Sequence, residues 1–469
     1  MFVARDHELE SLEALYKRAG FQMAVIYGRR RVGKTSLIDE FVKGKRTLYY
    51  TGQVRSSLLN LRELSRLTYE FFGLSATTPP FGAWSDALSF IAEHAGNERV
   101  VFVFDELPYA AHSEPGLPSA LQVTIDHGFK QGNVFMILCG SNEGFMESEV
   151  LGRNSPLYGR RTGQVHLQPF DYLDTSRMLP GATPKQLVEL YATFGGTPYY
   201  LAQIDPGESY ERNIARLMFD KDGMLYEEPL MLLRQELREP AAYNSVLSAI
   251  AAGATEPSRI ADAAGVEQRS IGKYLRVLIG LGLVERSVPF GENPARSKRG
   301  LYSIADPFFA FWYRFVEPAV GAVELGAGEA VAARLCAGQE LPTHVGRQFE
   351  RVALQWIARQ NRAGQLPFLA TEFGRWWGTD PEAKEQVDID LVAASKADRA
   401  ALFCECKWRN DFNETEAISA LERRSQLVGC FHSRTFALIT KNPVSAATRK
   451  KAAARDDLML VSADDMFEL

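Results

Sequence analysis

Three short, unbroken apolar runs stand out in the first third of the chain: Met23–Tyr27, Val100–Phe104 and Val134–Leu138. A strand buried on both faces has this pattern, because neither face needs polar side chains. Between the runs, apolar residues recur every three or four positions, as in amphipathic helices. Buried strands that alternate with helices predict an α/β fold with a parallel sheet.

The middle of the chain changes to a mainly helical pattern. Residues 183–238 read as helices interrupted at Gly195–Pro198, and we expect them to form a lid on the α/β core. Three helices follow, over residues 243–252, 259–264 (with Ser258 as N-cap) and 268–282. Two short strands, 283–288 and 301–304, complete a helix–turn–helix with a β-wing.

The pattern changes again near His344. A helix is expected over residues 345–360, and a strand over 368–377. Residues 386–393 alternate between polar and apolar, and the apolar run 400–408 follows after a turn, which predicts a hairpin. The expected domains are therefore residues 1–175 (α/β core), 176–238 (lid), 239–320 (winged helix) and 340–469 (a second α/β domain).

Composition places few limits on this organisation. Of the 469 residues, 46% are hydrophobic and 24% are charged, which is typical of globular domains. The net charge of −5 excludes a polycation, so any nucleic-acid contact must come from a local patch. Five cysteines, Cys430 among them, lack a zinc-binding spacing and predict free thiols in a reducing cytoplasm. No membrane span and no signal peptide is expected.

The first candidate site follows the first apolar run. The stretch Gly28–Ser36 contains Gly28-x4-Gly33-Lys34-Thr35, the spacing of a phosphate-binding P-loop. Glycines let backbone N–H groups approach phosphates, Lys34 reaches the β- and γ-phosphates, and the Thr35 hydroxyl binds Mg²⁺. The expected cofactors are ATP and Mg²⁺. The complete candidate loop is Gly28, Arg29, Arg30, Arg31, Val32, Gly33, Lys34, Thr35 and Ser36; its three arginines are expected to contact phosphate or the lid.

The later strands supply candidate catalytic groups. Asp105 and Glu106 end the second apolar run, where we expect Asp105 to hold Mg²⁺ and Glu106 to activate water. Ser141 or Asn142, after the third run, is a candidate contact to the γ-phosphate; a simple turn is the alternative. Arg160 and Arg161 are candidates for stabilising the transition state in cis or in trans, and surface charges are the alternative. A contact in trans would require a homo-oligomer formed through this domain.

The expected winged helix is locally basic. Between Pro257 and Leu301 there are eight basic and four acidic residues. DNA binding through the third helix and the wing is one interpretation, and a protein-packing module is the other. The candidate DNA-binding residues are Arg269, Lys273, Arg276, Arg296, Lys298 and Arg299.

The C-terminal hairpin carries a second constellation. We expect it to bring together Asp390, Glu405 and Lys407. Asp390 and Glu405 can bind Mg²⁺, and Lys407 can position or deprotonate water, which suits phosphodiester hydrolysis. A solvated strand face is the alternative interpretation.

Taken together, these motifs resemble those of the archaeal-type P-loop ATPases close to the AAA+/STAND group. In that family a winged helix and a C-terminal domain of the PD-(D/E)xK nuclease fold follow the ATPase. The resemblance implies ATP binding at Gly28–Ser36, and it adds Glu350 to Asp390, Glu405 and Lys407 in a nuclease-fold site. It rests on Phe2–Asp6, Gly28–Thr35, Phe104–Leu107, Gly140–Ser141, Gly195–Pro198, Asp306–Tyr313, Asp388–Asp390 and Glu405–Trp408.

Two functions are consistent with these expectations. The first is an ATP-hydrolysing enzyme that acts on DNA with a metal-dependent nuclease domain. The second is a nucleotide-gated switch that binds DNA or a protein and has no nuclease turnover.

Overall fold

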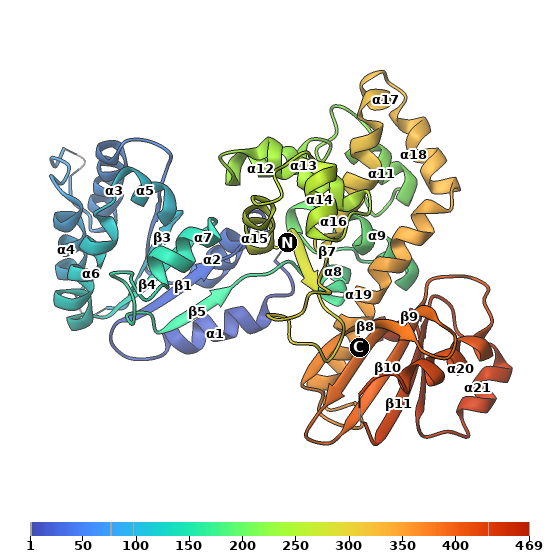
Figure 1. The fold of residues 1–469 in the computed structure, drawn as a ribbon. Helices are drawn as coiled ribbons and strands as arrows, with labels where there is room; N and C mark the ends of the chain where they lie inside the picture. Colours follow the sequence, from blue (N-terminus) through green and yellow to red (C-terminus); the bar gives the residue numbers. More distant parts are fainter. Residues whose placement is uncertain (1, 76, 97, 430, 469) are drawn as a thin grey trace. The chain divides into compact units, whose positions relative to one another are not determined.

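The computed structural model describes residues 2–75, 77–96, 98–429 and 431–468. The chain divides into two compact units, residues 1–169 and 170–469 (Figure 1). The first unit ends before the boundary expected at residue 175, because the next residues pack within the second unit. There the Tyr172 hydroxyl donates to the carbonyl oxygen of Met466, and Arg359 pairs with Asp171.

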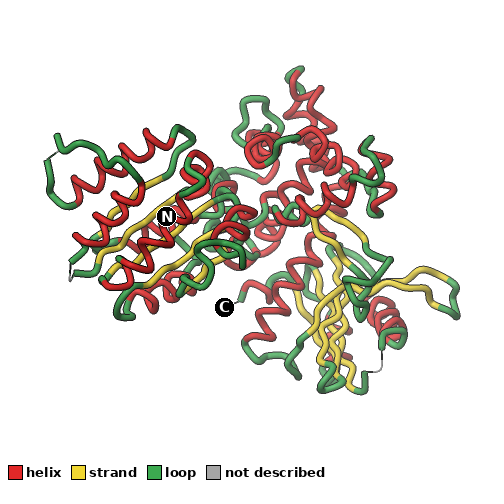
Figure 2. Tube along the Cα trace, turned by 60° about the vertical axis from the view of Figure 1, so that its left-hand side comes forward, coloured by secondary structure: helices red, strands yellow, loops and turns green. Residues whose placement is uncertain are grey.

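A five-stranded parallel sheet forms the centre of the first unit. Its strands are β1 (Gln22–Tyr27), β2 (Thr47–Thr51), β3 (Val100–Asp105), β4 (Val134–Gly140) and β5 (Gly163–His166), in the order β2-β3-β4-β1-β5. Figure 2 shows these strands side by side with helices around them. The helical elements are α1 (Asp6–Tyr16), α2 (Lys34–Val42), α3 (Ser57–Phe71), α4 (Trp84–His94), α5 (Leu107–Ser113), α6 (Leu117–His127), η1 (Phe129–Gln131), α7 (Glu143–Phe145) and η2 (Met146–Val150).

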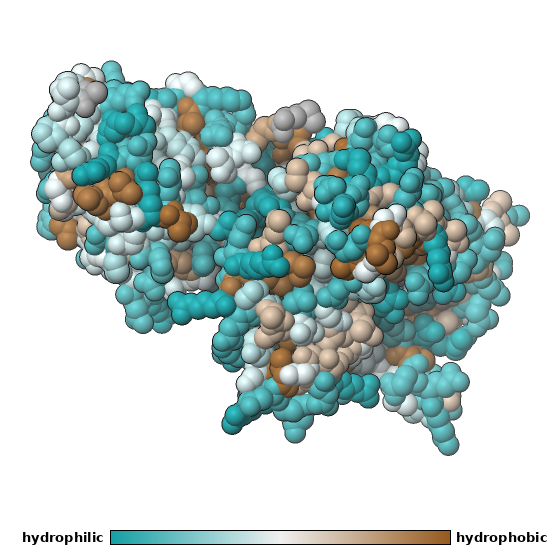
Figure 3. Space-filling view, turned by 90° about the horizontal axis from the view of Figure 1, so that it is seen from above, coloured by the Kyte–Doolittle hydropathy of each residue, from teal (hydrophilic) through white to brown (hydrophobic). Residues whose placement is uncertain are grey.

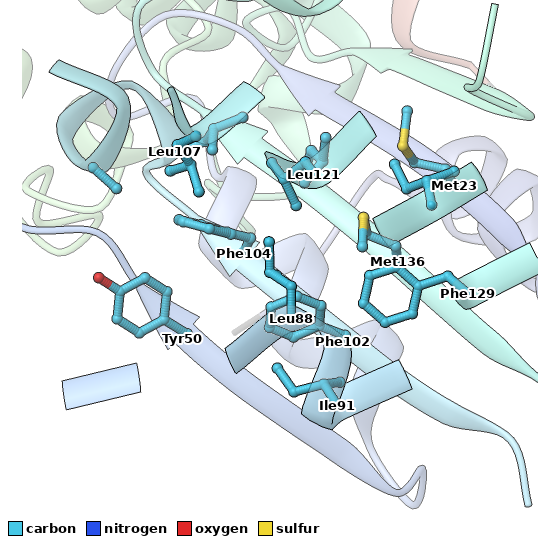
Figure 4. Packing of buried hydrophobic residues seen from close by; sticks show 14 of the residues in the cluster. Met23, Tyr50, Leu88, Ile91, Phe102, Phe104, Leu107, Leu121, Phe129 and Met136 are labelled. Atoms are coloured by element: carbon cyan, nitrogen blue, oxygen red, sulfur yellow. The ribbon is translucent and has the colours of Figure 1, made fainter. Parts of the chain in front are cut away.

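The parallel sheet is buried on both faces, as the apolar runs predict. Side chains alternate across β1: Met23 and Val25 join one core cluster with α3, α4 and α6, whereas Ala24 and Ile26 join another with α1 and α2. Phe102 and Phe104 lie in the first cluster (Figure 4) and are fully buried. Each such side chain contributes about 2–3 kcal/mol through removal from water. The expectation of an α/β core with a parallel sheet is confirmed.

The second unit begins with helices. They are α8 (Tyr172–Ser176), α9 (Pro184–Phe194), α10 (Pro198–Leu201), α11 (Tyr210–Met218), α12 (Glu228–Glu236), α13 (Pro240–Ala251), α14 (Pro257–Ala264) and α15 (Ile271–Gly280). The two-stranded antiparallel sheet of β6 (Val284–Ser287) and β7 (Leu301–Ile304) follows, then α16 (Pro307–Phe311), η3 (Trp312–Val316), η4 (Glu317–Ala319), α17 (Val320–Glu324) and α18 (Gly328–Ala337).

A second five-stranded sheet, of mixed direction, completes this unit. Its strands are β8 (Glu372–Asp380), β9 (Glu385–Ser395), β10 (Ala400–Lys407), β11 (Ser433–Thr440) and β12 (Leu458–Ser462), in the order β12-β11-β10-β9-β8. The pairs that involve β9 are antiparallel and the others are parallel. Its helical elements are α19 (Glu340–Arg362), α20 (Glu414–Ser425), α21 (Ala446–Ala452) and η5 (Asp465–Phe467).

The segment expected as a lid belongs to this second unit. The Gln355 side chain of α19 donates to the Tyr191 hydroxyl of α9 at 2.8 Å, and a ring nitrogen of His344 lies 3.0 Å from the Ala192 carbonyl oxygen. Buried aromatic side chains from α9 and α19 share one core cluster. α9 therefore packs into the same core as α19 and the C-terminal sheet. Its role in a lid on the ATPase core stays a prediction.

Several local expectations differ from the structure. Ser258 is not the N-cap of α14: the helix begins one residue earlier, at Pro257, and Glu256 precedes it. Arg269 lies before α15 rather than on it. Cys139, Cys336, Cys404 and Cys406 are free thiols, and Cys430 lies outside the described residues.

The surface drawn in Figure 3 is mainly hydrophilic, with apolar side chains in small separate groups. Within the described part of the chain, no helix combines the length and apolar character needed to cross a bilayer.

Candidate active sites

The P-loop connects the end of β1 to the start of α2. Gly28 has a φ of +151°, and a Cβ at this position would lie 2.2 Å from the carbonyl oxygen of Leu167. Gly33, with a φ of +95°, is left-handed and precedes the first residue of α2. Both positions require glycine, because a side chain would clash or strain the backbone. The loop thus leads directly to the N-terminus of α2, where backbone N–H groups favour phosphate.

Lys34 lies folded back onto this loop. Its Nζ donates to the carbonyl oxygens of Gly28 and Arg29 at 2.7 and 3.0 Å. The side chain is buried, and burial lowers the pKa of Lys34. A buried ammonium group that donates to neutral carbonyls is a favourable partner for an incoming phosphate.

Asp105 lies at the carboxyl end of β3 and is buried. Its Oδ2 accepts a hydrogen bond from the Tyr49 hydroxyl at 3.0 Å, and its Oδ1 accepts from the Glu106 N–H at 2.9 Å. Burial, and then the Asp105 carboxylate, raise the pKa of Asp39 on α2. With the exposed Thr35 hydroxyl, this edge offers the hard oxygen donors that Mg²⁺ prefers.

Glu106 is held by the residue that follows β4. Ser141 donates to Glu106 Oε2 through its hydroxyl at 2.9 Å and through its N–H at 3.3 Å. Glu106 has left-handed backbone angles (φ 47°, ψ 46°), an uncommon conformation for glutamate that is often found at functional sites. Asn142 instead caps α7 by accepting from the Phe145 N–H at 2.8 Å. Of the two candidates, Ser141 is therefore the one in contact with Glu106.

The P-loop arginines have different surroundings. Arg30 donates to the Tyr109 hydroxyl of α5, and its guanidinium lies 5.8 Å from the centre of that ring. Arg29 is buried, and Arg31 has a positive φ of 71°. Arg30 is therefore held by the helix that follows Glu106, which connects the P-loop to the strand carrying the acidic pair.

Two residues of this site were missed by the sequence analysis. Arg5 donates to the carbonyl oxygens of Val32 in the P-loop, at 3.1 Å, and Gln168 beyond β5, at 2.6 Å. Tyr49 holds Asp105 from the neighbouring strand. A signal existed for Arg5, which lies within the Phe2–Asp6 motif, but a tyrosine in a short strand carries none.

Arg160 and Arg161 lie before β5, whose first residue pairs with Ala24, whereas the P-loop follows the opposite end of β1. Arg160 forms a two-point ion pair with Asp126 on α6, with Nη2–Oδ2 at 2.5 Å and Nε–Oδ2 at 3.1 Å. Hydrogen bonding to Arg160 lowers the pKa of Asp126 to about 2. Arg161 is exposed and donates to the Leu151 carbonyl oxygen at 3.5 Å. This ion pair holds Arg160 at the end of β1 opposite the P-loop, and a transition-state role of Arg160, in cis or in trans, stays a prediction.

The basic residues of the middle segment also divide into groups. Lys273 and Arg276 are exposed on α15, and Arg269 pairs with Glu267 just before that helix. The wing loop (residues 288–300) joins β6 to β7; its Arg296 and Lys298 are exposed. Arg299 is engaged: it donates to Glu292 at 2.9 Å and to the Trp377 carbonyl oxygen of β8 at 2.6 Å.

The C-terminal sheet brings the second constellation together. We call Glu350 of α19, Asp388 and Asp390 of β9 and Glu405 of β10 the carboxylate cluster. Asp390 Oδ2 accepts from the Cys406 N–H at 2.8 Å, and Glu405 Oε1 accepts from Lys407 Nζ at 2.5 Å. Burial, and then Asp390, raise the pKa of Glu350; burial, and then Glu405, raise the pKa of Asp390. The carboxyl groups therefore lie near enough to oppose each other's ionisation.

Three basic side chains partner this cluster. Lys407 and Arg424 lie 2.5 and 3.6 Å from Glu405 oxygens, and Arg375 donates to Asp388 Oδ2. Across the described residues, no group of three or more His, Cys, Asp or Glu side chains is arranged to hold a metal ion. The oxygen donors of Asp390 and Glu405 have the chemistry that Mg²⁺ prefers, but in this arrangement a basic group pairs with Glu405.

Comparison with known families identifies two regions. Residues 2–204 match the model of an ATPase domain predominantly from Archaea, and residues 312–418 match a model of archaeal and bacterial proteins of unknown function. A curated relative, the uncharacterized protein MJECL04 of Methanocaldococcus jannaschii, is 31% identical over 433 residues, which cover 92% of this chain and 93% of the relative. The uncharacterized ATP-binding protein MJ0423 of the same organism is 48% identical over 46 residues, 10% of this chain and 78% of that protein.

Two solved structures illustrate the structural similarity. The Walker-type ATPase PABY2304 of Pyrococcus abyssi has 21% identity, covers 67% of this chain and 96% of its own, and gives a TM-score of 0.48. The ORC2 protein of Aeropyrum pernix has 16% identity, covers 69% of this chain and 95% of its own, and gives a TM-score of 0.39.

Proposed function

Because this chain belongs to the family of MJECL04 and carries an ATPase domain of a type found predominantly in Archaea, we propose that its ATP hydrolysis controls metal-dependent cleavage of DNA by its second unit. One observation supports the DNA-cleaving part of this proposal. One helix and two strands bring four side chains together, namely those of Glu350, Asp390, Glu405 and Lys407. In this proposal residues 176–238 form a lid, 239–320 a winged helix and 340–469 a nuclease-like domain.

In the ATPase site each side chain has one role. Lys34 leaves its carbonyl partners and binds the β- and γ-phosphates, and Thr35 and Asp105 would hold Mg²⁺. Glu106 accepts the proton of the attacking water, and Ser141 orients Glu106 through two hydrogen bonds. Tyr49 keeps Asp105 in place, so the acidic pair is positioned before nucleotide arrives.

In the C-terminal site Asp390 and Glu405 would hold a divalent cation, which supplies Lewis-acid activation of a phosphodiester when bound. Lys407 moves from Glu405 to position the attacking water, and the carboxylate form of Glu350 accepts its proton. DNA binds to this unit through exposed basic side chains, namely those of Lys273, Arg276, Arg296 and Lys298, together with Arg269, which lies just before α15. Arg299 belongs to the same set in this proposal, and it would exchange Glu292 and the Trp377 carbonyl for DNA phosphate.

A second function is favoured by a specific observation. Glu405 and Asp388 are each paired with a basic side chain, and among the described residues no metal-binding triad exists. A nucleotide-gated switch, in which the C-terminal unit clamps DNA without cleaving it, would need no metal at this cluster.

Plasmid nicking separates the two functions. Wild type, Glu405→Ala and Lys407→Ala are incubated with supercoiled plasmid and Mg²⁺ or Mn²⁺, with EDTA as the blank. Lys396→Ala is the matched control, because Lys396 forms an exposed pair with Glu372 in the same sheet. We expect nicking by wild type and Lys396→Ala and a loss of at least 100-fold in the other two. Equal residual nicking in all four proteins would refute cleavage at this cluster.

A further inference from the structure

Two arginines outside the C-terminal motif contact the carboxylate cluster. Arg375 of β8 donates to Asp388 Oδ2, and Arg424 of α20 lies 3.6 Å from Glu405 Oε2 and donates to the Asp388 carbonyl oxygen at 3.3 Å. In the sequence, Arg375 precedes β9 and β10, the two strands that carry Asp388, Asp390 and Glu405, and Arg424 follows them. Both guanidinium groups therefore converge on Asp388 and its neighbours.

The sheet is irregular where Arg375 faces β9. The pairing register of β8 with β9 shifts between Gly374 and Trp376, so Arg375 faces two residues of β9, Asp390 and Leu391, and the extra residue of this β-bulge lies on β9. A bulge redirects a side chain and leaves its backbone groups without a ladder partner. On the other side of β8, which is the edge strand of the sheet, the wing loop contacts the same residue: the Phe290 N–H donates to the Arg375 carbonyl oxygen at 2.8 Å. The wing loop thus binds the backbone of Arg375, while the Arg375 side chain contacts the carboxylate cluster.

Charge and exposure indicate what these arginines are for. A phosphodiester is an anion, and it cannot approach four clustered carboxylates unless basic groups stand at the entrance. The Arg375 side chain is 48% exposed and Asp388 is 41% exposed, whereas Glu405 is 7% exposed. Arg375 therefore lies at the open rim of the cluster, and Arg424 lies deeper, at 29% exposure.

We propose that Arg375 and Arg424 form a phosphate-binding subsite for a DNA backbone next to the carboxylate cluster, an inference that rests on the proposed function. Without ligand, each guanidinium pairs with a carboxylate. When DNA binds, the forked donors transfer to phosphate oxygens, a geometry that guanidinium groups match at two points. The same transfer releases oxygens of Asp388 and Glu405.

The test measures binding without cleavage. The full chain carrying Arg296→Ala and Lys298→Ala serves as parent, so that the exposed wing bases do not contribute, and saturating ADP fills the P-loop. Binding of 5′-fluorescein tetrathymidylate is followed by anisotropy in Ca²⁺ at several salt concentrations. Arg375→Ala and Arg424→Ala are compared with Arg423→Ala, a control on the same helix, whose arginine pairs with Glu416 at 3.7 Å.

We expect Arg375→Ala and Arg424→Ala each to weaken binding at least fivefold. Each should also reduce the salt slope by about 0.7, the value for one lost phosphate contact on a single strand. Arg423→Ala should retain parental affinity and slope. Parental affinity and slope in both test variants, or an equal loss in Arg423→Ala, would overturn the subsite while leaving plasmid nicking by wild type intact.

A structural role is separated by thermal melting and by the lysine variants. If an alanine variant has a lower melting temperature than the parent, the corresponding lysine variant, Arg375→Lys or Arg424→Lys, is measured in its place. A lysine keeps the positive charge but lacks the two-point geometry of the guanidinium group. The lysine variants should therefore regain the parental melting temperature and salt slope, but not the full affinity for the oligonucleotide. Full affinity in the lysine variants, or a parent that does not bind the oligonucleotide at all, would refute the subsite. Absence of plasmid nicking by wild type would refute the proposed function separately.

Discussion

The two sites of this protein differ in what holds their acidic groups. In the ATPase site the partners of Asp105 and Glu106 are neutral: a tyrosine hydroxyl, a serine hydroxyl and backbone N–H groups. In the C-terminal site Asp388 and Glu405 are paired with Arg375, Lys407 and Arg424.

This difference determines what each site can accept without rearrangement. Neutral partners orient a carboxylate and leave its charge available, so the ATPase site is ready for a cation and a phosphate. Ion pairs neutralise the charge internally, so a ligand of the C-terminal cluster has to displace a basic side chain first. The first site is therefore preorganised, and the second is closed by its own counterions.

The largest expected effect follows from removal of Lys34. Lys34→Ala should reduce ATP turnover by at least 1,000-fold, because this buried ammonium group stabilises the phosphate charge. Phosphate release measured at saturating ATP gives the value. Lys43→Ala, which removes an exposed lysine at the end of the same helix, should stay within twofold of wild type. Similar turnover in both variants would contradict the assignment of the P-loop.

Substitutions of Glu106 and Ser141 test whether the neutral hydrogen-bond partners in the ATPase site act only by orienting the carboxylate. Glu106→Gln should lower turnover about 100-fold and leave ATP binding unchanged, because it removes the base and keeps the hydrogen bonds. Ser141→Ala should lower turnover about tenfold, since the backbone N–H of residue 141 still contacts Glu106. Fluorescent nucleotide binding and phosphate release measure the two effects. An equal loss in both variants would mean that Ser141 acts on the nucleotide itself.

A substitution of Glu350 tests the C-terminal site, where neighbouring carboxyl groups oppose each other's ionisation. Because its folded-state pKa is raised, its contribution to stability is present below the ordinary glutamate pKa and is lost as pH rises through the raised value. Glu350→Gln should therefore stabilise the protein by about 1 kcal/mol at pH 8 and by less at pH 5. Thermal melting at both pH values measures this, with Glu340→Gln, an exposed position on the same helix, as control. Destabilisation at pH 8 would show that Glu350 is charged and well paired.

The smallest effect concerns Arg160. Arg160→Ala should leave ATP turnover within twofold of wild type and lower stability by about 1 kcal/mol, because its partner is Asp126 rather than nucleotide. Phosphate release and denaturant unfolding measure the two quantities. A loss of more than 100-fold in turnover would instead establish a contact in trans between copies of this chain.

Local patterns predicted the parts of this molecule that depend on neighbours in sequence. The apolar runs of β1, β3 and β4 identified the parallel sheet, because burial on both faces leaves a continuous signal. The P-loop was predicted because its glycines and Lys34 act together within a few residues. The meeting of Asp390 with Glu405 followed from the alternation of a hairpin.

Contacts between distant elements were beyond such reasoning. The ion pair of Arg160 could not be foreseen because its partner Asp126 lies on α6, 34 positions earlier. Tyr49 and Asp105 are joined only by the order of the strands in the sheet. Neither the charge of Arg299 nor its position between β6 and β7 predicts that it donates to the Trp377 carbonyl oxygen of β8.

The contact of the wing loop with β8 also bears on the chain's solubility during folding. β8 is an edge strand, and an edge strand presents unpaired carbonyl and N–H groups to other chains. The Phe290 N–H and the Arg299 side chain bind the carbonyl oxygens of Arg375 and Trp377 on this edge, and Phe290 packs 6.5 Å from Phe431, ring centre to ring centre. The wing loop thereby blocks strand-to-strand aggregation at these positions, and a chain that lost it would expose a template for intermolecular sheet growth.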